Sequence, residues 1–165
     1  MYKRQVFTKL GNAITVAARN GDDPETNFSL RLAIDRAKAA NIPKENIERA
    51  IKRGSGKLGN ANLEEIIYEG FLFGKLGIII EVLTDNKNRT VSEIKHILEK
   101  SEGTLAGPGA VIWMFNRSGS AEKKFIANEN YKIEINQEIE KKLQILFQQL
   151  DERDDILNYY TNAKI

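Results

Sequence analysis

The side chains best suited to hold a ligand are basic, and seven of the nine candidates lie in the first 60 residues. Residues 1–60 carry 12 Lys and Arg against 6 Asp and Glu, a net charge of +6. Of the 25 basic and 23 acidic residues of the chain, 13 and 17 remain for the rest, a net of −4. A basic front part favours an anionic partner such as nucleic acid, because guanidinium and ammonium groups neutralise phosphates. The candidate contacts here are Arg19, Arg31, Lys38, Lys44, Arg49, Lys52 and Arg53.

A second candidate site is a polar turn between an apolar run and a helix. Residues 77–83 are apolar and rich in β-branched types, which predicts a strand covered on both faces. Thr90 with Glu93 three residues later has the capping-box pattern, so we expect a helix to begin at Thr90. Lys87 and Arg89 would then stand beside a helix N-terminus, whose free N–H groups attract anions. The alternative is a turn that only closes the fold.

Catalytic and metal chemistry find little support in the sequence. There is no Cys and a single His, His96, which excludes disulfides, thiolate metal sites and ordinary Cys–His pairs. Asp85 with Glu81 and Glu69 could act as paired carboxylates, but no nucleophile or oxyanion device accompanies them. We therefore expect no catalytic residue, no metal and no cofactor.

No apolar run approaches the roughly 18 residues that a membrane span needs, and nothing at the N-terminus resembles a signal peptide. We therefore expect a soluble cytoplasmic protein without a membrane partner.

The first part of the chain is typical of a small helical domain. Apolar residues recur at helical spacing, and Gly or Pro ends each run, which predicts helices over about 7–19, 27–40 and 43–54. The second helix is apolar almost all round, so we expect it at the centre of the bundle. Residues 54–60 contain three glycines and predict a linker, which gives a helical domain over 1–60. Residues 2–5 match a translated sequencing adapter, and residues 1–5 are interpreted as a scar.

The second part alternates between strand and helix patterns and predicts a domain over 61–165. We expect one sheet with two helices packed on it, an α+β sandwich. The strands are placed at 65–71, 78–83, 110–115 and 156–160, with short runs near Phe125 and at 131–135, and the last helix at 139–150.

Several collinear motifs carry a family resemblance. They are Gly21-Asp22-Asp23-Pro24 with Asn27, residues 42–44 and 47–54, Tyr68-Glu69-Gly70, residues 85–90 and residues 107–115. Together they resemble the YebC family, which comprises bacterial proteins long described as transcriptional regulators and the related mitochondrial translational activator of cytochrome oxidase. The resemblance covers Val6 to Ser118 and resumes at about Ala121. Family members usually begin with a basic tail and carry a third domain inserted in the second. We expect a trimmed member here, without the tail and without the third domain, whose place would be near 118–121.

The resemblance implies a three-helix bundle followed by a ferredoxin-like α/β sandwich, and nucleic-acid work without catalysis. The expected partner is DNA, in the regulation of transcription, or ribosomal or transfer RNA, in translation on the ribosome. We expect a monomer in the cytoplasm, with the mitochondrial matrix as the alternative location.

A second class of function stays open. The acidic sheet domain could dock a protein partner, the basic helices being incidental, and the protein would then be an interaction module without nucleic-acid contact. Trp113, Phe115, Tyr159 and Tyr160 could stack on bases, although aromatic residues in strands more often belong to a core. Salt-dependent binding to generic RNA or DNA separates the two classes.

Overall fold

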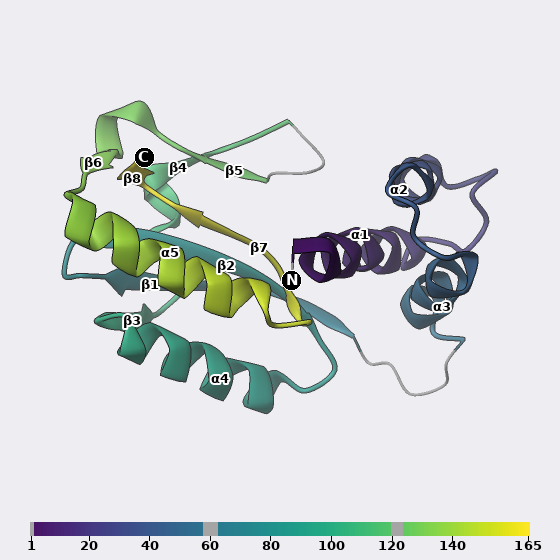
Figure 1. The fold of residues 1–165 in the computed structure, drawn as a ribbon, viewed down its shortest axis with the longest axis horizontal. Coiled ribbons are helices and arrows are strands. Elements are labelled where there is room, and N and C mark those ends of the chain that lie inside the picture. The colour runs from purple at the N-terminus through teal and green to yellow at the C-terminus, as the bar shows by residue number, and fades with distance from the viewer. Residues whose placement is uncertain (1, 58–62, 120–123) are drawn as a thin grey trace. The chain divides into compact units, whose positions relative to one another are not determined.

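The computed structural model describes residues 2–57, 63–119 and 124–165 of the chain. The chain divides into two compact units, residues 1–64 and 65–165. The first is helical, and the second combines helices with strands (Figure 1). The predicted α+β class, a helical bundle followed by a two-layer α/β sandwich, is confirmed.

The first unit consists of three helices, α1 (Tyr2–Ala18), α2 (Phe28–Ala39) and α3 (Lys44–Ser55). Helix α1 packs against both other helices, whereas α2 and α3 touch each other little. The prediction that α2 is the central helix is therefore wrong. The shared core is formed by Ile14, Ala17, Ala18, Leu30, Ala33, Ile34, Ala37, Ile42, Ile47 and Ala50.

The contact between α1 and α3 depends on Gly54. A Cβ atom at this position would overlap the carbonyl oxygen of Thr15 and lie 2.9 Å from the Cβ of Ala18. The Thr15 hydroxyl also donates to the carbonyl oxygen of Ala50, at 3.2 Å. Only a residue without a side chain lets the two helices approach this closely.

Both ends of the first unit differ from their predicted bounds. Helix α1 begins at Tyr2 and so includes residues 2–5, whose origin as a scar stays a prediction. Helix α3 runs to Ser55 and ends at Gly56, which adopts the left-handed conformation with φ of 79°. Residues 58–60 of the predicted linker lie outside the described residues.

The second unit is built on a four-stranded sheet with the order β3-β1-β2-β7. β3 runs antiparallel to β1, and β7 antiparallel to β2, with Ile80 opposite Tyr159. Two helices lie on one face of this sheet (Figure 1). The elements are β1 (Glu64–Leu72), β2 (Leu76–Thr84), α4 (Lys87–Lys100), β3 (Gly103–Ala106), α5 (Gln137–Asp151) and β7 (Ile156–Thr161).

Smaller elements flank the sheet. β4 (Phe115–Arg117) pairs antiparallel with β5 (Phe125–Ala127), and β6 (Ile133–Glu134) pairs parallel with β8 (Ala163–Lys164). Two short 3-10 helices, η1 (Ile112–Met114) and η2 (Glu129–Tyr131), connect them.

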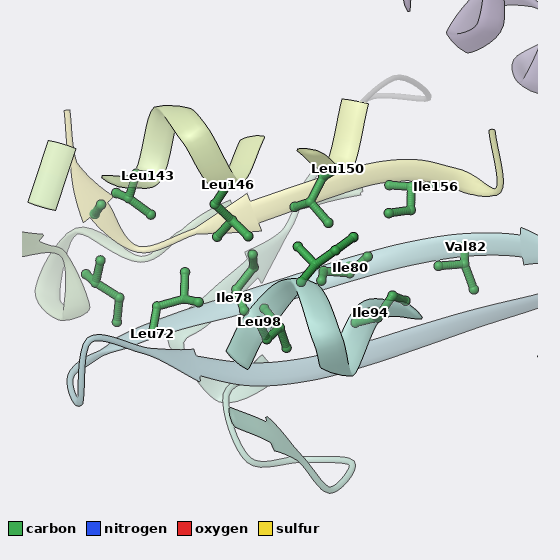
Figure 2. Close-up of a cluster of buried hydrophobic side chains, with 13 residues drawn as sticks. Leu72, Ile78, Ile80, Val82, Ile94, Leu98, Leu143, Leu146, Leu150 and Ile156 are labelled. Atoms are coloured by element: carbon green, nitrogen blue, oxygen red, sulfur yellow. The ribbon is translucent and has the colours of Figure 1, made fainter. Parts of the chain in front are cut away.

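Strand β2 is buried along its whole length, as the apolar run at 77–83 predicts. One of its faces meets α4 and α5, where Ile78 and Ile80 pack against Leu98 and Leu146 (Figure 2). The other face is covered by η1 with the residue before it and by β4 and β5, which contribute Val111, Phe115 and Phe125 against Ile79 and Tyr160. Burial on two faces explains why no polar residue but Glu81 interrupts the strand before Thr84.

The predicted strand over 110–115 is wrong. These residues form a turn and η1, and β4 begins only at Phe115. The reason is the buried carboxylate of Glu69, which accepts hydrogen bonds from the N–H groups of Gly109, Val111 and Ile112 at 2.7–2.9 Å. N–H groups held by a side chain cannot join a strand ladder, and β3 takes the place in the sheet.

The predicted helix start at Thr90 is also wrong. Helix α4 begins at Lys87, and its N-cap is Asn86, whose side chain accepts the N–H of Arg89 at 3.1 Å. The Thr90 hydroxyl is instead buried and donates to Asp155. Part of the predicted junction at 118–121 lies outside the described residues, which omit 120–123.

Candidate nucleic-acid interface

The outer face of α3 carries three cations. Ile47 and Ala50 are buried against the bundle core, and this anchors the helix by its opposite side. Arg49 and Lys52 are exposed as a result, and Arg53 is half-buried beside them. Within the described parts of the chain, none of these three side chains has an ion-pair partner. We call Arg49, Lys52 and Arg53 the α3 basic face.

Arg19 lies at the same end of the bundle as Arg53. It is exposed and follows the last residue of α1, Ala18. Ala18 in turn packs against Gly54, next to Arg53. The close α1–α3 contact therefore brings two predicted basic residues, distant in sequence, to one end of the helical unit.

The other three predicted residues of this unit lie elsewhere, around a groove between α2 and α3. Arg31 and Lys38 reach it from α2, and Lys44 from the start of α3. The groove encloses about 600 Å³, and its apolar lining is supplied by Ile34, Ile42, Ile47 and Ile51.

Charge in this α2–α3 groove is balanced. Glu25, Asp35 and Glu48 line it together with the three cations, and Lys44 pairs with Glu48 at 3.9 Å. Carboxylates repel phosphate, so the groove is a poorer phosphate contact than the α3 basic face. The seven predicted residues of the helical unit therefore separate into two surfaces of different chemistry.

Lys87 and Arg89 belong to the second unit and lie on the first turn of α4, both exposed. Arg89 pairs with Asp85 at 3.6 Å. The Asn86 side chain already occupies the N–H of Arg89, so this helix N-terminus offers fewer free donors than the sequence predicts. The turn thus keeps one cation without an ion pair among the described residues, Lys87.

Sequence reasoning missed Phe28. Its ring is 62% exposed, and the guanidinium carbon of Arg31 lies 5.2 Å from the ring centroid. The sequence does hold a signal for it, because Phe28 and Leu32 are four residues apart on the side of α2 opposite Leu30. This spacing does not by itself predict an exposed ring, because a helix that is apolar on all sides could also lie at the centre of a bundle.

The aromatic residues of the second unit are mostly core. Phe115 and Tyr160 are buried, and burial raises the pKa of the Tyr160 phenol to about 12. Tyr159 stacks on Phe147 with ring centroids 4.8 Å apart. Of the four aromatic residues considered for base stacking, Trp113 is the exposed one, at 55%, and it packs edge-to-face with Tyr131, which is itself 42% exposed.

The acidic residues considered for catalysis have structural surroundings. Glu69 is committed to three backbone N–H groups. Glu81 is buried, and this desolvation raises the pKa of its carboxyl group, opposed by the charge of Lys124.

His96 is exposed on α4. Within the described residues no three His, Cys, Asp or Glu side chains gather as metal ligands, and no helix is long and apolar enough to cross a membrane.

Two family models match the chain. Residues 1–57 match the TACO1/YebC protein N-terminal domain, and residues 63–122 match the TACO1/YebC second and third domain. A solved structure, a conserved hypothetical protein from Aquifex aeolicus, shares the fold with a TM-score of 0.82 and 30% identity. That match covers 98% of this chain and 90% of the other, so it includes the segment beyond residue 122.

Curated relatives are bacterial proteins named probable transcriptional regulatory proteins. One from Caldanaerobacter subterraneus subsp. tengcongensis is 58% identical over 118 residues, which is 71% of this chain and 49% of the relative. One from Thermoanaerobacter pseudethanolicus is 55% identical over 118 residues, 71% of this chain and 48% of the relative. The chain spans about half the length of the curated relatives it matches. Family models, sequence relatives and the solved structure agree, and the chain belongs to the TACO1/YebC family.

Proposed function

We propose that this protein is a regulatory factor of the YebC type that binds nucleic acid through the α3 basic face. The observation that carries the proposal is the presentation of Arg49, Lys52 and Arg53 on one side of a rigid helix, with no ion pair to neutralise them within the described residues. Three cations so placed can each meet a phosphate without first breaking a salt bridge. Such contacts position a protein on nucleic acid and carry no sequence information directly.

The charge distribution supports the same partner. The net charge of +6 on residues 1–60 attracts polyanions, whereas the net charge of −4 on the remainder repels them. We therefore expect the helical unit to make the first contact with nucleic acid. Arg19 extends the basic surface at one end of the unit, and the groove cations Arg31, Lys38 and Lys44 flank it on the α2 side. In the second unit, Lys87 and Arg89 form a lesser contact at the start of α4.

The names of the bacterial relatives favour a role in the regulation of transcription, with DNA as the target. Action in translation on the ribosome, with ribosomal or transfer RNA as the target, is the other form of the same proposal. We place the protein in the bacterial cytoplasm, as a monomer without catalytic activity. Crosslinking in cells followed by sequencing of the bound nucleic acid tests the choice, since genomic DNA fragments and ribosomal RNA give distinct read profiles.

A protein-interaction role is the second candidate, and one observation favours it. Trp113, Ile126 and Tyr131 are large apolar side chains, each more than 40% exposed, on the flanking elements of the second unit. Exposed aromatic side chains of this kind are frequent in protein interfaces. A pull-down with Trp113→Ala as the control variant distinguishes this role, because loss of a protein partner with unchanged nucleic-acid binding would favour it.

A further inference from the structure

Helix α2 has two apolar faces, and only one of them is used by the fold. Leu30, Ala33 and Ala37 pack into the bundle core. On the opposite side, Phe28 and Leu32 remain 62% and 39% exposed. Phe28 therefore keeps most of a large aromatic side chain in solvent at the start of α2, where a partner can contact it.

The surroundings of Phe28 define the chemistry of that contact. The Arg31 guanidinium lies over the ring, 5.2 Å from its centroid, in a cation–π arrangement. Arg31 also lines the α2–α3 groove, so one guanidinium group contacts both the ring and the groove. Flat π-faces and guanidinium planes are the surfaces on which unpaired bases stack.

The α2–α3 groove, which shares Arg31 with Phe28, suits a nucleoside better than a phosphate. Four isoleucine side chains provide apolar lining. Glu25, Asp35 and Glu48 offer carboxylate oxygens that accept hydrogen bonds, and the amino groups of bases and the hydroxyls of a sugar are donors. The cations among them, Arg31 and Lys38, can contact the flanking phosphates.

We propose that Phe28 and the α2–α3 groove capture an unpaired nucleotide of a single-stranded nucleic acid. The base stacks on the Phe28 ring beside Arg31, and the sugar faces the groove carboxylates. A duplex cannot supply this ligand, because its bases are paired and stacked on each other. The inference rests on the proposed function and adds to it a class of target, a strand with accessible bases, with phosphates held at the α3 basic face.

The test compares three probes of equal length, about 12 nucleotides, which is within the range of single-strand site sizes. They are a fluorescently labelled oligo(A) strand, the same strand annealed to its complement, and an abasic strand that keeps the phosphates. Binding of the full chain is measured by fluorescence anisotropy. Phe28→Ala should weaken binding of the single strand by roughly 5- to 150-fold, the range expected for losing one stacked base. The abasic strand and the duplex should bind this variant as they bind the wild type.

Matched variants isolate the role of the ring. Leu32→Ala removes an exposed apolar side chain from the same side of α2 and should leave all three affinities unchanged. Phe28→Trp keeps a stacking surface and should retain the single-strand preference. Because Phe28 is exposed, the Phe28→Ala protein should keep the wild-type circular dichroism spectrum and melting temperature. RNA and DNA versions of the single strand identify which backbone the groove prefers.

Equal weakening of all three probes by Phe28→Ala, or no weakening of any, overturns the capture of a base. Different outcomes test the proposed function. If Arg49→Ala with Arg53→Ala weakens all probes while Phe28→Ala matches the wild type, phosphate binding stands and base capture is rejected. If the wild type binds none of the probes, both are rejected.

Discussion

Thr90 and Asp155 are joined by a buried hydrogen bond of 2.7 Å between the threonine hydroxyl and Oδ2 of the aspartate. The bond links the start of α4 to the residue before β7. The main-chain oxygen of Asp155 also accepts the N–H of Leu83 at 2.8 Å, so the same residue holds the end of β2.

Changing Thr90 to Val keeps the shape of the side chain but removes its hydroxyl. Asp155 Oδ2 is then left in a buried position with one donor fewer. We expect the free energy of unfolding to fall by about 1–3 kcal/mol, measured by urea denaturation. Thr104→Val, at an exposed site on β3, is the control and should change stability by less than about 0.5 kcal/mol. Equal stability of the two variants would show that the bond contributes nothing net.

Two glycines in the helical unit should respond in opposite directions to the same substitution. Gly54→Ala forces a Cβ against Thr15 and Ala18 and should destabilise the unit by about 1–3 kcal/mol, as overpacking does. Gly11→Ala, inside α1 with nothing within 4 Å of the new atom, should stabilise it by about 0.5–1 kcal/mol. Thermal unfolding followed by circular dichroism at 222 nm, the usual helix signal, compares them. A stabilising Gly54→Ala would contradict the close α1–α3 contact.

Removing two cations from the α3 basic face should change how binding depends on salt. With Arg49→Ala and Arg53→Ala together, the slope of log affinity against log salt should become shallower by roughly 0.7–0.9 for each phosphate that is no longer neutralised. The weakening should be similar for unrelated sequences. Lys95→Ala with Lys100→Ala, two exposed positions on α4, makes the same change of net charge and should keep the wild-type slope. A double Arg variant with the wild-type slope would exclude this face as a phosphate contact.

The turn before α4 should contribute to binding without contributing to stability. Lys87→Ala with Arg89→Ala removes two cations from a helix N-terminus, where positive charge is slightly unfavourable. We therefore expect an unchanged or slightly higher melting temperature and weaker binding to generic RNA. A sharp fall in melting temperature with unchanged binding by the folded protein would identify the turn as purely structural.

Glu81 should make stability depend on pH. Burial raises the pKa of its carboxyl group above the value in the unfolded chain. The protonated group is therefore favoured in the folded state, and the stability this provides is present below the unfolded pKa and lost as pH rises through the folded pKa. We expect Glu81→Gln to remove that loss.

Free energies of unfolding measured from about pH 4, near the unfolded pKa, to neutrality test this difference. Glu81→Gln should gain on the wild type as pH rises, while Glu99→Gln, at an exposed site on α4, should follow the wild-type curve. Parallel curves for all three proteins would show that Glu81 ionises as freely in the folded state as in the unfolded chain.

The elements that the sequence predicted well are those with local signals. Asn27 caps α2 through the N–H of Leu30, at the position where the sequence predicts that this helix begins, and the apolar run at 77–83 forms the buried strand β2. The errors come from distant contacts. Residues 110–114 have the pattern of a strand, but the carboxylate of Glu69, some 40 residues earlier, accepts hydrogen bonds from backbone N–H groups of this segment. The sequence around Thr90 has the pattern of a helix cap, but the Thr90 hydroxyl donates a hydrogen bond to Asp155, 65 residues later.

The candidate site could be predicted from the sequence only in part. Helical spacing alone turns Arg49 and Lys52 away from Ile47, so the α3 basic face follows from periodicity. The role of Phe28 does not, because an apolar pattern cannot show which face of a helix the fold buries. That choice depends on how α1 is placed between its neighbours, and the separate grouping of Arg31, Lys38 and Lys44 around the groove depends on it too.

The pairing of Ile80 with Tyr159 has a consequence for biosynthesis. Strand β2 is synthesised early, but the strand that covers its edge, β7, leaves the ribosome only when the chain is nearly complete. Until then an apolar strand keeps a row of unpaired N–H and C=O groups, which other nascent chains can pair with. The helical unit makes its internal contacts within residues 1–64, so it can fold before β7 is synthesised. Messages truncated before the codon for Ile156 should therefore yield a folded helical part attached to an aggregating remainder.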